Sequence, residues 1–257
     1  MIDDIPEVGS DRPPLASDSA QRPLVALVWS IWSALGLVTF AFVLTLLAGT
    51  LVAEIIDAGW GKLLHALLVG GVFVGMYAAM VGIVWAVSAS SGVRFAEAVG
   101  ARKPVGARWY ATAVVVAAGG WLFSVTFMTA LQALGIDVPR EDLAVYRLMP
   151  SGLLGAAIMS ALLIVVAPLA EEVVYRGVLL SAIDDRWGST AALVFSAVVF
   201  SAAHLSLVGF LPLFVVGALF GWLFLTSRSL KVAIVAHAVF NSLGVAVLLA
   251  QKTSGIL

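Results

Sequence analysis

The sequence contains no cysteine, which excludes disulfide bonds, a cysteine nucleophile and metal sites built from thiolates. Histidine is also scarce, with three in 257 residues. Charged residues make up 11% of the chain, whereas they are about a quarter of an average soluble domain. The 14 basic and 15 acidic residues nearly balance and form no basic block. We therefore expect no nucleic acid among the partners of this chain.

Hydrophobic residues, in contrast, make up 62% of the chain. No soluble fold has enough interior to bury so much apolar sequence, because the surface of a soluble domain is largely polar. The composition predicts an all-α, polytopic transmembrane helix bundle that has membrane lipid as its surroundings. The apolar segments are rich in alanine and valine, a composition that we associate with a bacterial cell membrane.

Residues 1–23 differ from the rest of the chain, because they hold five acidic side chains and four prolines. Such a segment buries too little apolar surface to offset the entropy of ordering it, so we predict a disordered tail. Its acidic start lacks the positive region that opens a secretory signal. Residues 24–257 are predicted to form the transmembrane domain.

Seven segments are long and apolar enough to be predicted as membrane helices, since a bilayer core needs about 20 helical residues. They lie at residues 24–53, 63–87, 109–134, 151–183, 189–207, 208–226 and 232–250. The fourth is too long for a plain crossing and contains Pro168, which removes a backbone hydrogen bond and predicts a kink. The fifth and sixth are separated only by the weak turn signal of Gly209 and Pro212.

The lysines and arginines of the predicted loops lie mostly on one side of the membrane. That side carries Arg12, Arg22, Arg94, Arg102, Lys103, Arg108, Arg186, Arg228 and Lys231, and the other side carries Lys62, Arg140, Arg147 and Lys252. Cytoplasmic loops are enriched in these residues. We therefore predict a cytoplasmic N-terminus and, after seven crossings, an external C-terminus.

Two adjacent carboxylates follow an apolar run in the fourth segment. Glu172 and Arg176 are four residues apart, so they share a helix face and can pair. Glu171 points about 100° away from Glu172 and has no obvious local cation. A charge at bilayer depth costs at least a few kcal/mol unless it is paired, so an unpaired carboxylate there is a candidate general base. The structural alternative is an ion pair at the membrane interface that ends the helix.

Polar side chains also interrupt two later apolar segments. Phe200 lies one turn before His204 on the same helix face. His237 and Asn241 are likewise four residues apart, and two neutral polar side chains on one face can donate hydrogen bonds to a developing oxyanion. The structural alternative for each pair is hydrogen bonding between helices. All three polar spots lie in the last third of the chain, which favours a common site.

The ordered set EExxxR, FxxxH and HxxxN resembles the CPBP family, the CAAX-processing and bacteriocin-processing intramembrane proteases, also called the Abi family. The resemblance covers about residues 151–250. Family members include the type II CAAX prenyl endopeptidases, which remove three residues from a prenylated C-terminus, and proteins tied to bacteriocin maturation or immunity. The resemblance implies hydrolysis of a peptide bond inside the membrane or at its edge.

The resemblance also implies roles for the matching residues. Glu171 would be the base that activates water, and His204 would position or deprotonate that water. His237 and Asn241 would stabilise the oxyanion. The residues that would support the site are Glu172, Arg176 and Phe200.

The family has been described both as metalloprotease-like and as glutamate-dependent without a metal. Glu171, His204 and His237 could supply the three protein ligands of a catalytic zinc. The zinc-protease motif HExxH is absent, however, and no second carboxylate is free if Glu172 pairs with Arg176. We therefore favour a glutamate mechanism without a cofactor, and zinc is the alternative.

The sequence thus predicts an intramembrane endopeptidase that acts on a membrane-associated peptide or protein. One alternative is an ion-coupled transporter, because intramembrane Glu, His and Arg also build ion paths. Carriers usually contain internal repeats, and the first three apolar segments show no convincing similarity to the later ones. The other alternative is a non-catalytic immunity or scaffold protein, which would tolerate the substitution Glu171→Gln.

Overall fold

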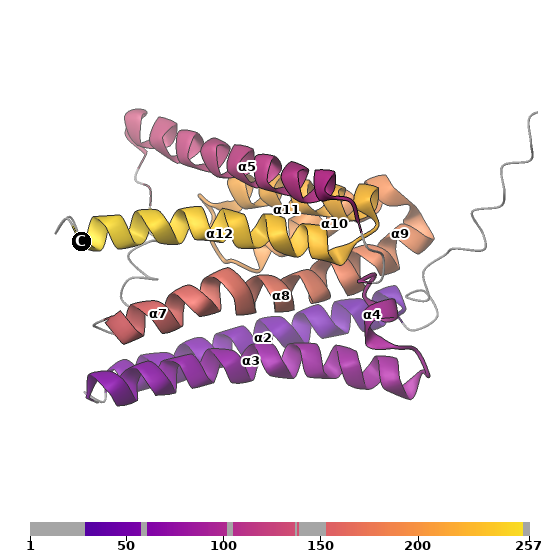
Figure 1. The fold of residues 1–257 in the computed structure, drawn as a ribbon, viewed down its shortest axis with the longest axis horizontal. Coiled ribbons are helices and arrows are strands. Elements are labelled where there is room, and N and C mark those ends of the chain that lie inside the picture. Colours follow the sequence, from indigo (N-terminus) through magenta and orange to yellow (C-terminus); the bar gives the residue numbers. More distant parts are fainter. Residues whose placement is uncertain (1–28, 58–60, 102–104, 137, 139–152, 254–257) are drawn as a thin grey trace, which may run out of the picture.

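The computed structural model describes residues 29–57, 61–101, 105–136, 138 and 153–253. Throughout these residues the regular structure is helical, and they contain no strand, which confirms the predicted all-α fold class (Figure 1). The predicted disordered tail, residues 1–23, lies outside the described residues.

Among the described residues, four helices precede the long fourth apolar segment. They are α2 (Ile31–Asp57), α3 (Lys62–Ser90), the short α4 (Phe95–Ala98) and α5 (Ala107–Ala133). The fourth segment is one continuous helical rod, divided into α7 (Leu153–Ala161), η2 (Leu162–Val166), α8 (Ala167–Glu172), η3 (Val173–Leu180) and α9 (Ser181–Trp187). The chain continues with α10 (Ser189–Ala202), α11 (Phe210–Ser227) and α12 (Leu230–Thr253).

Six of these helical stretches are long and apolar enough to cross a membrane. The exception among the predicted seven is α10, whose 14 residues span about 21 Å, less than the hydrocarbon thickness of about 30 Å. Large apolar side chains cover the outside of the bundle, and only 11% of the apolar window of α5 is buried. This exposure is the surface that lipid covers in an integral membrane protein.

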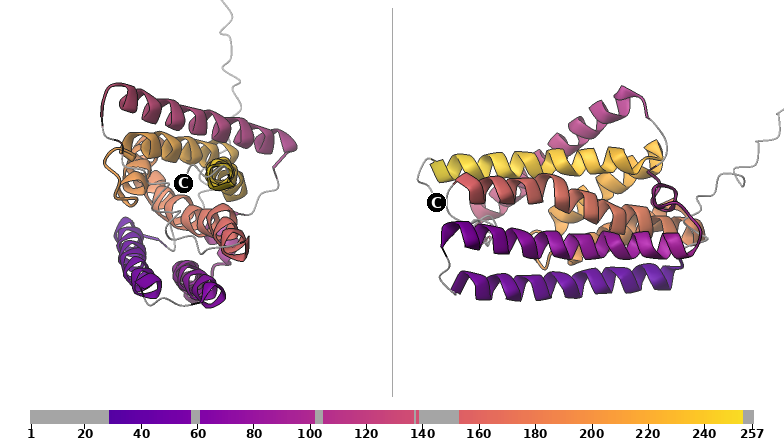
Figure 2. Two further views of the ribbon diagram at one scale, coloured as in Figure 1. Left: turned by 90° about the vertical axis from the view of Figure 1, so that its left-hand side faces the viewer. Right: turned by 60° about the horizontal axis from the view of Figure 1, so that its bottom comes forward.

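The helices pack in layers around the rod (Figures 1 and 2). Helices α2 and α3 form an antiparallel pair on one side of it, and both contact η3. Helices α10, α11 and α12 lie on the other side, and α5 packs outermost against α11 and α12. The rod is therefore the central element, and its polar residues face partners from both layers.

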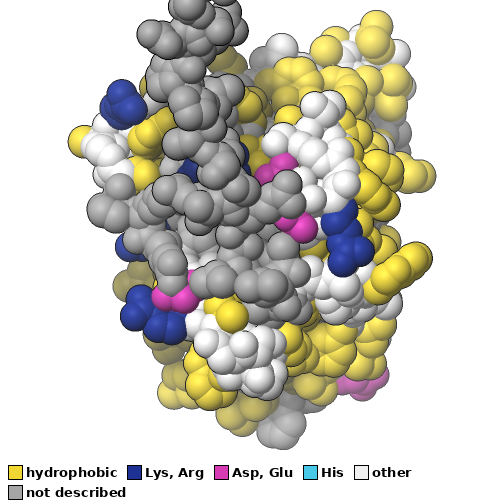
Figure 3. Space-filling view, turned by 90° about the vertical axis from the view of Figure 1, so that its right-hand side faces the viewer, with side chains coloured by type: hydrophobic (Ala, Val, Ile, Leu, Met, Phe, Trp, Pro, Cys, Tyr) yellow, Lys and Arg dark blue, Asp and Glu magenta, His cyan; other side chains and the backbone are white. Residues whose placement is uncertain are grey.

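One end of the bundle gathers several connections and most of its described cations (Figure 3). Helix α2 begins at this end and α12 finishes at the opposite one (Figure 1). The helix ends that lie there carry Arg94 before α4, Arg108 in the first turn of α5, Arg186 in the last turn of α9, Arg228 after α11 and Lys231 at the start of α12. The cytoplasmic orientation of this end stays a prediction from the lysine and arginine counts.

Helix α10 is shorter than the sequence indicates, because it ends at Ala202 and not near residue 207. A turn follows it, in which Leu205 has a left-handed backbone (φ 55°) and the Ser206 hydroxyl oxygen accepts the Gly209 N–H. The prediction that His204 lies on a membrane helix was therefore wrong, since His204 belongs to this turn.

Pro168 does not break the fourth helix, contrary to the sequence-based expectation of a kink or break. The chain winds more widely just before it, in the π-helical segment η2, where the Ala167 N–H bonds back five residues to the Leu162 carbonyl. The rod then continues to Trp187. The helix thus changes locally from α-helical to π-helical hydrogen bonding and continues past the proline, which has no N–H to donate.

The packing of α4 against the rod gives a first testable prediction. A Cβ atom on Gly177 would lie 2.9 Å from the Val99 Cβ and 3.3 Å from the Val99 backbone, and Val99 is fully buried. We expect Gly177→Ala to destabilise the protein by about 1–3 kcal/mol, because the backbone at Val99, directly after α4, has to move. Thermal unfolding of the purified protein in detergent measures this loss.

The matched control is Gly71→Ala in α3, where an added Cβ meets nothing within 4 Å. This control should unfold at the same temperature or slightly higher, because alanine favours a helix over glycine by about 1 kcal/mol. Equal unfolding temperatures for the two variants would show that the contact between α4 and η3 is looser than described.

Candidate active site

The centre of the molecule contains a fully buried ion pair. Glu172 and Arg176 both have zero exposure, and the Arg176 Nη1 donates to the Glu172 Oε1 at 2.7 Å. Arg176 also donates through Nη2 to the Gly217 carbonyl at 2.9 Å. Its guanidinium lies 4.6 Å from the Phe200 ring centroid and 5.6 Å from that of Phe220. The predicted pairing is confirmed, and it fixes Arg176 between α10 and α11.

His237 brings α12 to the same carboxylate. Its Nδ1 lies 2.8 Å from the Glu172 Oε1, and because a carboxylate oxygen accepts, the imidazole carries the proton at Nδ1. The ring is nearly buried and tilts against Phe220, with centroids 5.2 Å apart. One oxygen of Glu172 therefore accepts hydrogen bonds from two donors. Its role is structural, because these bonds hold it in the core.

Glu171 has a different environment, although it is the next residue along the chain. Its side chain is 17% exposed, its Oε1 accepts a hydrogen bond from the Tyr77 hydroxyl at 3.2 Å, and its Oε2 lies 3.9 Å from the His237 Nε2. No described lysine or arginine forms an ion pair with it. Glu171 lies close to the middle of the rod, 18 residues after Leu153 and 16 before Trp187. Among the described residues it is thus a carboxylate without a lysine or arginine partner, near the middle of the bundle.

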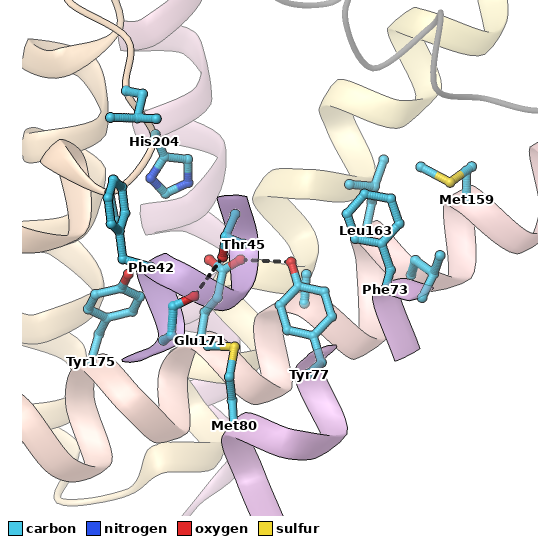
Figure 4. A pocket seen from close by; sticks show the side chains of 15 residues that line it. Phe42, Thr45, Phe73, Tyr77, Met80, Met159, Leu163, Glu171, Tyr175 and His204 are labelled. Carbon is cyan, nitrogen blue, oxygen red and sulfur yellow. Dashed lines mark hydrogen bonds between the residues drawn. The ribbon is translucent and has the colours of Figure 1, made fainter. Parts of the chain in front are cut away.

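Glu171 faces a cavity of about 420 Å³ between α2, α3, the rod and the turn after α10 (Figure 4). Most of the wall is apolar. The lining residues that Figure 4 labels are Phe42, Thr45, Phe73, Tyr77, Met80, Met159, Leu163, Glu171, Tyr175 and His204. An apolar cavity with a few convergent polar groups is the usual form of a site that binds a small molecule or a peptide segment.

His204 reaches this cavity from the turn (Figure 4). Its Nδ1 lies 2.8 Å from the Phe200 carbonyl, which only accepts, so Nδ1 carries the proton and Nε2 keeps a lone pair in the neutral ring. The imidazole packs on the Phe200 ring at 4.8 Å. Phe200 therefore orients two groups of the site, Arg176 through its ring and His204 through its carbonyl.

Asn241 lies one helical turn after His237, as predicted, but its amide is directed at the backbone of the rod. The Asn241 Nδ2 donates to the Leu163 carbonyl at 2.8 Å. The structure thus brings Glu171 and His204 together at one cavity, places His237 next to Glu171, and gives Asn241 a backbone partner beside that cavity.

Sequence reasoning did not identify Tyr77, Tyr175 and Phe220 as members of the site. Tyr77 and Tyr175 line the cavity, and Phe220 packs on Arg176 and His237. A signal existed for Tyr77, which is residue 16 of the 29 in an otherwise apolar α3. A hydroxyl at that depth needs a hydrogen-bond partner, and its partner is Glu171.

The donor set does not fit a zinc site. Within the described ranges, no group of three or more Asp, Glu, His or Cys side chains lies close enough to hold one ion. The Nδ1 of His237 is bonded to Glu172 and the Nδ1 of His204 to a backbone carbonyl, so each ring has only Nε2 left as a possible ligand, as metal-binding histidines usually do. A catalytic zinc needs three protein ligands, and the described side chains do not bring three together at one point.

Part of the chain is similar to a known protein family. Residues 153–243 match the family model described as type II CAAX prenyl endopeptidase Rce1-like. No curated protein and no solved structure matches the chain. The matched segment runs from α7 into α12 and contains every motif residue, whereas Tyr77 lies outside it. The chain is an integral membrane protein, and over this segment it is similar to the CAAX-processing membrane proteases.

Proposed function

We propose that this protein is an intramembrane endopeptidase that hydrolyses a peptide bond of a membrane-associated peptide or protein without a metal. One observation carries the proposal: Glu171, a carboxylate with no lysine or arginine partner among the described residues, faces a cavity that it shares with His204. Keeping such a group at bilayer depth costs free energy, and function is the usual reason that it is retained.

Glu171 and His204 are suited to activate water between them. The neutral His204 offers the lone pair of Nε2 to a water hydrogen, because its Nδ1–H is bonded to the Phe200 carbonyl. The Glu171 carboxylate accepts the proton as the water oxygen attacks the substrate carbonyl. The bond from water oxygen to carbonyl carbon forms, and the carbonyl oxygen becomes the oxyanion of the tetrahedral intermediate.

His237 and Asn241 are the proposed donors to that oxyanion. With a proton already on Nδ1, the His237 Nε2 donates only when the ring is an imidazolium, and Glu172 supplies the adjacent negative charge. Asn241 keeps a second amide hydrogen besides the one bonded to Leu163. Collapse of the intermediate breaks the C–N bond, and Glu171 returns its proton to the leaving amine.

The apolar wall of the cavity favours a substrate that brings hydrocarbon surface with it. The family name specifies prenylated C-termini as one such substrate class. If the protein is bacterial, as its composition indicates, CAAX cleavage names the family and the physiological substrate is another membrane-associated peptide.

The substitution Glu171→Gln tests the proposed base. We expect turnover to fall by about 10²–10⁴-fold, because the amide cannot accept the proton of water, while the fold is retained. The assay is cleavage of a farnesylated CAAX peptide and of a transmembrane peptide by purified protein in detergent, with and without a chelator.

The matched control is Glu54→Gln on the exposed surface of α2, which should cleave like the unchanged protein. Full cleavage by the Glu171→Gln variant would overturn the assignment. Loss of cleavage by the unchanged protein in the chelator would instead favour the metal-dependent alternative.

The hydrogen bond from Tyr77 gives a second prediction. In Tyr77→Phe the Glu171 carboxylate loses the one hydroxyl donor that it has among the described residues. Hydrogen bonds to charged groups contribute about 1.5–3 kcal/mol, so we expect kcat to fall about tenfold or more while KM changes little. Tyr110→Phe on α5, which packs away from the cavity, is the control. A kcat equal to that of the control would show that Tyr77 does not act on Glu171.

A further inference from the structure

The wide turn before Pro168 leaves a carbonyl of the rod without a helical donor. In η2 the Ala167 N–H bonds five residues back, to the Leu162 carbonyl. In the same register the next donor would be the N–H of residue 168, and its acceptor would be the Leu163 carbonyl. Residue 168 is a proline and has no N–H. The helix itself therefore does not satisfy Leu163.

Asn241 supplies the missing donor from another helix. Its Nδ2 lies 2.8 Å from the Leu163 carbonyl oxygen, although the two residues are 78 positions apart in sequence. An unpaired carbonyl inside a membrane protein costs free energy, because lipid offers no donor. The bond joins α12 to the rod at the point where the backbone register changes.

Side chains also donate to backbone carbonyls along the second π-helical segment. The Ser181 hydroxyl donates to the Arg176 carbonyl at 3.0 Å, and the Ser196 hydroxyl donates to the Tyr175 carbonyl at 3.1 Å. Side-chain donors thus serve backbone carbonyls in both segments where the rod departs from α-helical geometry. At Asn241 the donor comes from α12, the helix that also carries His237.

We propose that Asn241 is a positioning residue that acts through the Leu163 carbonyl, and that Pro168 and Asn241 form a matched pair. The proline leaves the Leu163 carbonyl without a helical donor, and the asparagine on α12 supplies one. The bond sets the axial position of α8, the segment of six residues that follows η2 and ends in Glu171 and Glu172. The effect on turnover rests on the proposed function, whereas the effect on stability does not.

A double-mutant cycle tests this pair on the full chain in detergent. Asn241→Ala should lower the thermal unfolding midpoint by about 3–6 °C, because the Leu163 carbonyl loses its donor. In a Pro168→Ala background the new N–H at residue 168 can satisfy that carbonyl, so the same substitution should lower the midpoint by less than half as much. Pro168→Val, which supplies the same N–H with a side chain of similar size, repeats the cycle if Pro168→Ala does not fold.

Equal losses in the two backgrounds would overturn the proposal, because independent residues give additive effects. Ser242→Ala is the matched control on α12, since the Ser242 hydroxyl bonds within its own helix to the Ala238 carbonyl. The change that Ser242→Ala causes in the thermal unfolding midpoint should be the same with and without Pro168.

Turnover of the same variants separates positioning from direct oxyanion binding. If Asn241 positions the rod, the fall in kcat caused by Asn241→Ala should be at least threefold smaller in the Pro168→Ala background, with KM little changed. An equal fall in both backgrounds, without coupling of the midpoints, would assign Asn241 to the oxyanion alone and overturn the inference. If no probe is cleaved by any variant, the proposed function fails, and the midpoints alone still decide the inference.

Discussion

The arrangement of this site depends on the shared oxygen of Glu172. One buried carboxylate oxygen binds both the guanidinium of Arg176 and the imidazole of His237, and this joins the rod to α11 and α12. Breaking a buried pair by removing one partner typically costs about 3–5 kcal/mol, because the remaining charge is left without compensation. The interaction makes two neighbouring glutamates unequal. Glu172 is held by the core, and Glu171, about 100° further around the helix, is left facing the cavity.

The geometry of the rod explains how polar groups from four elements meet in an apolar bundle. Two π-helical segments loosen its backbone hydrogen bonds, and side chains from neighbouring elements supply donors to the carbonyls concerned. π-Helical turns inside α-helices often occur at functional sites. Here they flank α8, the short segment that carries both glutamates. The backbone is therefore irregular where the chemistry is proposed, and regular helices surround it.

The features that could be predicted from the sequence depend on composition and on the spacing of residues along one helix. The composition indicated an all-α membrane bundle, and the spacing of Glu172 and Arg176 indicated their pairing, which the structure confirms. The sequence could not predict contacts that only packing decides. The hydroxyl of Tyr77 donates to Glu171, which lies 94 positions later in the sequence. The amide of Asn241 donates to the Leu163 carbonyl, to which Pro168 has no N–H to donate. The end of α10 at Ala202 was missed because its apolar composition continues into the turn.

The most direct measurement compares the two adjacent glutamates in one experiment, by unfolding and turnover of Glu171→Gln and Glu172→Gln in the same detergent. The account predicts different results: the variant at 171 unfolds like the unchanged protein but loses turnover by about 10²–10⁴-fold. The variant at 172 loses several degrees of stability, because Arg176 stays buried without its full counter-charge. Equal unfolding temperatures for the two variants, with turnover kept at 171, would contradict the division of roles between them.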